Sequence, residues 1–124
     1  LEQLDKISGP VHLTIDIDGL DGVLVPATGT PVPGGLTFWQ VAETIATLFN
    51  SKTATVVSAD INEIVPQKDT PLTQFTAAML AAKVVSSHII SKREGRWQPY
   101  SKQQGKIRQL GVGNYFSSQS SKDY

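Results

Sequence analysis

The sequence predicts an α/β fold built on a parallel sheet. Two segments, residues 11–18 and 53–61, are rich in β-branched and apolar residues and have the length of buried strands. Each is followed by apolar residues at helical spacing, over residues 37–50 and 72–91. Strands that alternate with helices are typical of parallel sheets with right-handed crossovers and helices packed on the sheet.

The first predicted strand, residues 11–18, ends in two carboxylates, Asp16 and Asp18. Side chains two apart on a regular strand point the same way, so these like charges would repel each other unless a cation lay between them. Oxygen ligands of this kind suit Mg²⁺, Ca²⁺ or Mn²⁺. In most sequences, however, two acids so spaced at a strand end are only part of a solvated turn.

The segment after the first strand, residues 19–36, contains five Gly and three Pro and has no helical period. Long loops of this kind inside a compact domain are usually functional. The loop ends at Thr37 and Gln40, which have the spacing of a capping box and therefore predict the start of the first helix.

The second predicted strand, residues 53–61, also delivers acids near its carboxyl end, namely Asp60 and Glu63. Thr70 as N-cap and Pro71 as first helical residue predict the start of the second helix. The apolar positions of this helix are Leu72, Phe75, Met79, Ala82, Val85 and Ile89. Because two strands are too few for a stable sheet, the remaining strands must come from elsewhere.

Charge divides the chain into two parts. Residues 1–91 hold four Lys against nine acids, a balance of −5, whereas residues 92–124 hold seven Lys or Arg against two acids, a balance of +5. We expect the first part to be the α/β unit and the second to be a basic, extended tail that lies on a neighbouring subunit. No nucleic-acid motif accompanies the tail, so binding to nucleic acid is not expected.

Several kinds of site are excluded or disfavoured by composition. The chain has no cysteine, which rules out disulfides, zinc–thiolate sites and cysteine nucleophiles. No apolar run approaches about 20 residues, so no transmembrane helix is predicted. His12 lies early in the first strand and His88 lies late in the second helix, and both are expected to pack or to face solvent rather than bind a metal. The start at Leu1 suggests a processed or truncated chain.

Three stretches carry a family resemblance. Residues 16–21 and 26–37 closely resemble the ureohydrolase signature of arginases and agmatinases, and residues 60–66 resemble the acidic segment that the family has on its next strand. The resemblance covers about residues 11–90. It implies that residues 1–91 are the βαβα, carboxyl-terminal portion of a three-layer, parallel-sheet, arginase-like fold, completed by a missing half or by a partner chain.

The resemblance also implies roles for individual residues. Asp16 would bridge two Mn²⁺ ions and Asp18 would coordinate one of them. Glu63 would pair with the planar guanidinium of the substrate, with Thr30 beside it. A hydroxide between the two ions would attack the guanidino carbon, and the C–N bond would break to release urea.

This sequence departs from the family at two positions and in two missing segments. Gly22 stands where the family usually has Pro, and Gln40 stands where it usually has Glu. In addition, the other metal ligands of the family come from a Gly-Gly-Asp-His segment and an Asp-Ala-His-x-Asp segment, and neither occurs in this sequence. Two ligands are too few for a binuclear site, so a polypeptide that carries the amino-terminal half of the fold is an expected partner.

Two functions remain open. The chain is either part of a split or processed ureohydrolase, active on arginine or agmatine within an oligomer or larger complex, or a catalytically inactive accessory or scaffold subunit of a larger assembly. An independent binding domain fits less well, because the sheet would be too small. The resemblance favours an intracellular location, cytoplasmic or mitochondrial.

Overall fold

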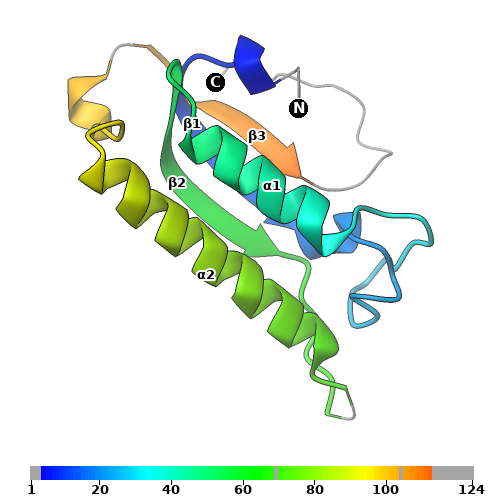
Figure 1. Cartoon of the computed structure of the whole chain (residues 1–124). Helices are drawn as coiled ribbons and strands as arrows, with labels where there is room; N and C mark the ends of the chain where they lie inside the picture. The colour runs from blue at the N-terminus through cyan, green and yellow to red at the C-terminus, as the bar shows by residue number, and fades with distance from the viewer. Residues whose placement is uncertain (1–3, 69, 104, 113–124) are drawn as a thin grey trace.

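Three parallel strands form the sheet, in the order β2-β1-β3, and two long helices pack against it (Figure 1). The computed structural model describes residues 4–68, 70–103 and 105–112. The elements are η1 (Leu4–Lys6), β1 (Gly9–Asp16), η2 (Ile17–Gly19), α1 (Phe38–Phe49), β2 (Ala54–Asn62), α2 (Leu72–Arg93), η3 (Tyr100–Lys102) and β3 (Arg108–Val112). The predicted βαβα order and the parallel sheet are confirmed.

The two faces of the sheet differ in chemistry. The face of β1 that lies in the hydrophobic core carries Val11, Leu13 and Ile15, all fully buried. The alternate residues of β1 are His12, Thr14 and Asp16, and they face Ser58, Asp60 and Asn62 across the β1–β2 ladder. This alternation follows from the two-residue period of a strand. The apolar face therefore supplies the core, and the polar face brings side chains with hydrogen-bonding groups together.

Both helices contribute to the core on the apolar face (Figure 1). The core residues of α1 are Val41, Ile45, Leu48 and Phe49, and those of α2 are Ala77 and Leu80. Among the described residues, no helix covers the polar face of the sheet. Complete three-layer folds have helices on both faces, so the described chain shows one helical layer and part of the sheet.

Helix α1 begins at the predicted capping box. The Thr37 hydroxyl accepts a hydrogen bond from the Gln40 backbone N–H at 3.2 Å, and Gln40 Oε1 accepts one from the Thr37 backbone N–H at 2.9 Å. Each bond satisfies a backbone donor that has no partner inside the helix. Gln40 therefore fulfils the structural role of the Glu that the family usually has at this position.

Replacing Thr37 by alanine should lower the free energy of unfolding by about 1 kcal/mol, because one N-terminal N–H of α1 loses its acceptor. Denaturant titration of the wild-type and variant chains measures this difference. Thr44→Ala is the matched control, since the Thr44 hydroxyl bonds only to the Gln40 carbonyl within the helix. A loss for Thr44→Ala equal to that for Thr37→Ala would show that the cap contributes nothing.

Helix α2 presents its large apolar residues outward. Phe75 is 69% exposed and Met79 is 54% exposed, whereas the residues buried against the rest of the chain are mostly small or polar. They are Thr73, Thr76, Ala77, Leu80, Ser87 and Ser91. The N-cap is Pro71 rather than the predicted Thr70, so the helix begins one residue later than expected. The outward apolar surface indicates that α2 packs against further protein in the complete fold.

The segment after α2 is attached to the body of the chain. Trp97 Nε1 donates a hydrogen bond to the Val56 carbonyl at 2.9 Å, and the Trp97 ring meets the His88 ring edge-to-face at 5.0 Å. Farther along, β3 joins the chain's own sheet, although composition had suggested an extended or weakly ordered segment. The predicted arm over a neighbouring subunit stays a prediction, and residues 113–124 lie outside the described part. None of the helices in the described part has the length and apolar character needed to cross a bilayer.

Candidate functional site

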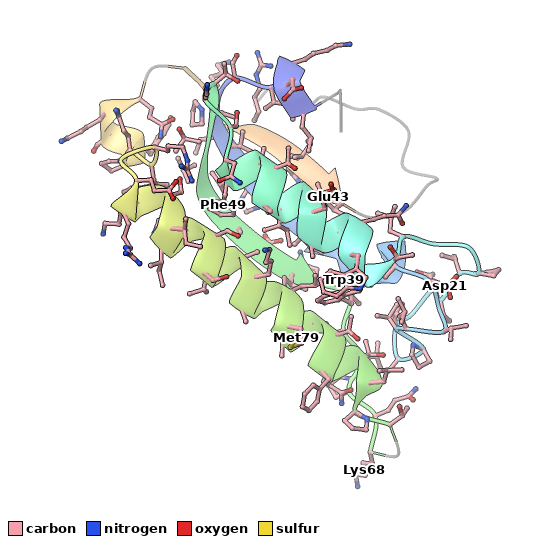
Figure 2. All side chains as sticks on the ribbon, in the orientation of Figure 1. Asp21, Trp39, Glu43, Phe49, Lys68 and Met79 are labelled. Carbon is pink, nitrogen blue, oxygen red and sulfur yellow. The ribbon has the colours of Figure 1, made fainter. Side chains whose placement is uncertain are left out.

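The candidate site residues gather at the carboxyl ends of β1 and β2. Asp16 is the last residue of β1, Asp18 lies in η2 directly after it, and Glu63 directly follows β2. Figure 2 shows the same end of the molecule, where Asp21 lies in the loop after β1 and Trp39 in the first turn of α1. In open parallel sheets, ligands bind beyond the carboxyl ends of the strands.

Asp18 is almost completely buried, with 1% of its surface exposed. One of its carboxylate oxygens, Oδ2, accepts a hydrogen bond from the Thr30 hydroxyl at 2.5 Å. The structure therefore brings together two residues that the resemblance had assigned to the site, one from η2 and one from the Gly-rich loop. The predicted strand, residues 11–18, began and ended two residues too late, because the chain turns into a 3-10 helix at Ile17. Asp16 and Asp18 are consequently not alternate residues of one regular strand.

Asp16 is half-buried and lies among other acids. Burial raises the pKa of Asp16, and the charges of Asp18 and Asp60 raise this pKa further, whereas a hydrogen bond from Asn62 lowers it. A carboxyl group that is both desolvated and surrounded by negative charge is stabilised in its ionised form by a cation. The chemistry at Asp16 and Asp18 therefore fits part of an oxygen-ligand metal site.

The ligand set in the described part of the chain is incomplete. No group of three or more His, Cys, Asp or Glu side chains placed to hold a metal ion occurs among the described residues. Asp16 and Asp18 would supply two ligands, and a metal ion such as Zn²⁺ or Mg²⁺, which requires roughly four to six, would need others. The metal-binding roles expected for Asp16 and Asp18 therefore stay predictions.

The Gly-rich loop is folded back onto η2 by backbone bonds. Asp21 is the organising residue, because its carboxylate accepts hydrogen bonds from Gly34 N at 2.7 Å and from Val23 N at 2.9 Å. A Cβ added to Gly35 would lie 2.5 Å from the Leu20 carbonyl carbon, so only glycine fits there. Asp21 belongs to the family signature, but no role was predicted for it. The signal was available, since Asp commonly bonds to backbone N–H groups two residues on.

Glu63 has a left-handed backbone conformation, with φ at 65°. Non-glycine residues adopt this conformation at a cost of about 1–3 kcal/mol, and such residues cluster at functional sites. The segment is fixed by a hydrogen bond from Val65 N to the Ala27 carbonyl at 3.0 Å, and Ala27 N in turn donates to the Thr73 hydroxyl at 2.9 Å. Glu63 is therefore an exposed carboxylate on a backbone held beside the Gly-rich loop.

The polar face of the sheet carries a hydrogen-bonded network next to Asp16. His12 bonds through one ring nitrogen to Ser58 at 2.8 Å and through the other to Asp60 at 3.0 Å. The Asn62 amide donates to Asp60 at 2.7 Å and to the Thr14 hydroxyl at 3.2 Å. The hydrogen bond from Thr14, and then the neighbouring His12, lower the pKa of Asp60. The network follows the β-bulge at Val11 and His12 and fixes the register of β1 on β2.

Neither histidine lies among the candidate metal ligands. His12 belongs to the network just described, and the His88 ring packs between those of Phe49 and Trp97, at 6.4 Å and 5.0 Å between centroids. These positions agree with the packing and surface roles expected for both residues.

The chain is a parallel-sheet α/β protein with two carboxylates at the end of β1 and a Gly-rich loop that is joined to one of them through Thr30 and Asp18. Residues 1–90 match the arginase family, and the chain belongs to that family. Residues 91–124, which include the end of α2 and the tail, lie outside this match.

Named relatives agree with the family assignment. The chain is 41% identical over 80 residues to the N(1)-aminopropylagmatine ureohydrolase of Thermococcus kodakarensis, covering 64% of this chain and 27% of that protein. It is 40% identical over 96 residues to human mitochondrial arginase-2, covering 74% of this chain and 26% of that protein. The crystal structure of the agmatine ureohydrolase of Thermoplasma volcanium has a TM-score of 0.63 and 32% identity, with 75% and 30% coverage. The chain therefore spans less than a third of the length of these relatives.

Proposed function

We propose that this chain supplies the carboxyl-terminal part of a binuclear manganese site that hydrolyses a guanidino C–N bond and releases urea. The observation that carries the proposal is the contact between Asp18 and Thr30, at 2.5 Å, beside Asp16. This hydrogen bond joins an acid that follows β1 to the Gly-rich loop, and both residues lie in the stretches that resemble the family signature. The remaining metal ligands belong to the rest of the fold, on the same polypeptide or on another.

In this proposal Asp16 and Asp18 hold the metal ions. When bound, the manganese ions supply positive charge that lowers the pKa of water and polarises the guanidino group. The Thr30 hydroxyl donates its hydrogen bond to Asp18 and so fixes the orientation of that carboxylate. The burial of Asp18 strengthens its interaction with a cation, since little solvent screens it.

Glu63 is proposed to bind the substrate. A carboxylate matches the planar, delocalised guanidinium, to which it binds through two parallel hydrogen bonds. The exposed side chain and the left-handed backbone of Glu63 are consistent with a residue held ready for a ligand. Arginine, agmatine and related guanidino compounds share this group, and their other ends contact residues outside the described chain.

A second candidate function is an inactive accessory or scaffold subunit of a larger assembly. It is favoured by the incomplete ligand set of the described residues and by an apolar groove between β2 and the side of α2 that carries Gln74, Ala77 and Ala81. The groove is lined by Ala59, Asp60, Ile61, Ile64, Gln74, Ala77, Ala78, Ala81, Val84 and Val85. Both functions require further protein against α2, and they differ in whether metal is bound.

A hybrid protein tests the proposed role of Glu63. In the hybrid, residues 1–90 replace the matching region of human mitochondrial arginase-2, whose remaining part supplies the rest of the fold. Glu63→Gln in the hybrid should raise KM for arginine by about tenfold or more, because a charged hydrogen-bond acceptor for the guanidinium is lost. The manganese content should not change, since Glu63 is not a proposed ligand. Loss of manganese with unchanged KM would contradict the assignment.

A further inference from the structure

Strand β3 covers one edge of β1 with a short and exposed segment. The two strands pair from Val11 opposite Arg108 to Ile15 opposite Val112. Val112 is the one buried residue of β3, Leu110 is half-buried against the core, and the other three residues are exposed, so side-chain packing adds little to the backbone bonds between β3 and β1. Another strand can replace β3, because the backbone N–H and C=O groups at the edge of β1 can pair with any extended segment.

The origin and the connection of β3 set it apart from the rest of the sheet. The family match ends at residue 90, so β3 comes from sequence outside it. Strands β2 and β3 lie on opposite sides of β1 while both helices lie on one face, so the two crossovers have opposite hand. About 98% of such crossovers in proteins are right-handed. Since the β1–α1–β2 unit lies inside the family match, the crossover to β3 is the exceptional one.

The edge of β1 that β3 covers is the edge at which a strand with further metal ligands would lie beside Asp16. Asp16 stands at the end of β1, and β2, on one flank, already brings Glu63. Strands that carry the outstanding ligands reach Asp16 most directly from the other flank, where the structure places β3 within the described residues. The relatives are more than three times as long as the region they share with this chain, so they hold further elements that could supply such strands.

We propose that β3 is a displaceable strand that occupies the edge of β1 at which the rest of the ureohydrolase fold adds a strand of its own. The tail then acts as a built-in competitor of assembly. Because β3 is tethered to the same chain, it competes at a high effective concentration. The apparent affinity for the rest of the fold is then the intrinsic affinity multiplied by the fraction of chains in which the edge of β1 is open. This inference rests on the part of the proposed function that has the fold completed by further protein, and not on catalysis.

The test measures binding of these chains to the part of human mitochondrial arginase-2 that precedes the matching region, expressed separately. Four chains are compared: the full chain, residues 1–112 as a control that keeps β3, residues 1–103 without β3, and the full chain with Leu110→Pro. Proline at position 110 removes a backbone donor from the middle of β3, opposite Leu13. Hydrogen exchange of residues 9–16 reports whether the edge of β1 is open, and exchange of α1 reports whether each chain is folded.

The two chains without a paired β3, residues 1–103 and Leu110→Pro, should bind the probe about tenfold or more tightly than the full chain and residues 1–112. Before binding, fast hydrogen exchange in β1 is expected only for the two chains without a paired β3. Equal binding by all four chains would overturn the proposal, as would binding by none of them while α1 stays protected. Binding is read without metal or substrate. Tighter binding by the chains without a paired β3 would therefore support the inference even if the hybrid protein released no urea, and the latter result would count only against the proposed catalysis.

Discussion

Alanine in place of Asp16 should remove bound manganese and abolish urea release in the hybrid protein. If Asp16 holds both ions, as the family resemblance implies, its loss would remove one ligand from each of them. Mutation of a residue that only orients a metal ligand typically lowers metal affinity or activity 10–100-fold, so mutation of a direct ligand should lower it by more than about 100-fold. Metal analysis of the purified hybrid and a urea assay measure the two effects.

His88→Ala is the matched control for this variant. The His88 ring contacts Phe49 and Trp97 and takes no part in the candidate site, so manganese content should stay at the wild-type value even if stability falls. Unchanged manganese after Asp16→Ala would show that the carboxylate is not a ligand. Loss of manganese from both variants would show only that the fold had been disturbed.

Alanine in place of Gly35 should lower the free energy of unfolding of the hybrid by about 3 kcal/mol. The added Cβ would lie 2.5 Å from the Leu20 carbonyl carbon, 2.6 Å from its oxygen and 2.7 Å from Asp21 N. These are backbone atoms of the segment that follows η2, so no side-chain rotation relieves the contact. Moving them would also pull the loop away from Asp18, and urea release should fall together with stability.

Gly29→Ala provides the comparison within the same loop. A Cβ at Gly29 would meet nothing within 4 Å, and its backbone conformation is compatible with alanine. The change should therefore be neutral or stabilise by less than about 1 kcal/mol, through lower entropy of the unfolded chain. Chemical denaturation of both variants decides the matter. Equal stability of the two would mean that the loop does not close on η2 as described.

Local sequence signals predicted much of the fold. The capping box at Thr37 and Gln40 located the start of α1 because both of its hydrogen bonds are made within four residues. The β-branched runs located β1 and β2 to within about two residues, the usual uncertainty of element boundaries. The extension of the first strand to Asp18 was wrong, because apolar residues such as Ile17 suit a buried 3-10 turn as well as a strand.

Features that depend on distant contacts could not be predicted. The spacing of Phe75 and Met79 defined a face of α2, but periodicity does not say which neighbour a face meets, and the structure places it outward. The pairing of β3 with β1 joins segments almost a hundred residues apart, and composition carries no signal for it. The Thr30–Asp18 contact was not predicted: the family resemblance placed Thr30 beside the guanidinium bound by Glu63, and a span of twelve residues across a loop sets no geometry.

The manganese content of the wild-type hybrid tests the central claim most directly. If residues 1–90 carry their share of the site, the purified hybrid should bind two manganese ions per chain and release urea from arginine, and Asp16→Ala should do neither. A hybrid that is folded by circular dichroism, is monodisperse, and binds no manganese would contradict the claim that Asp16 and Asp18 belong to a working metal centre.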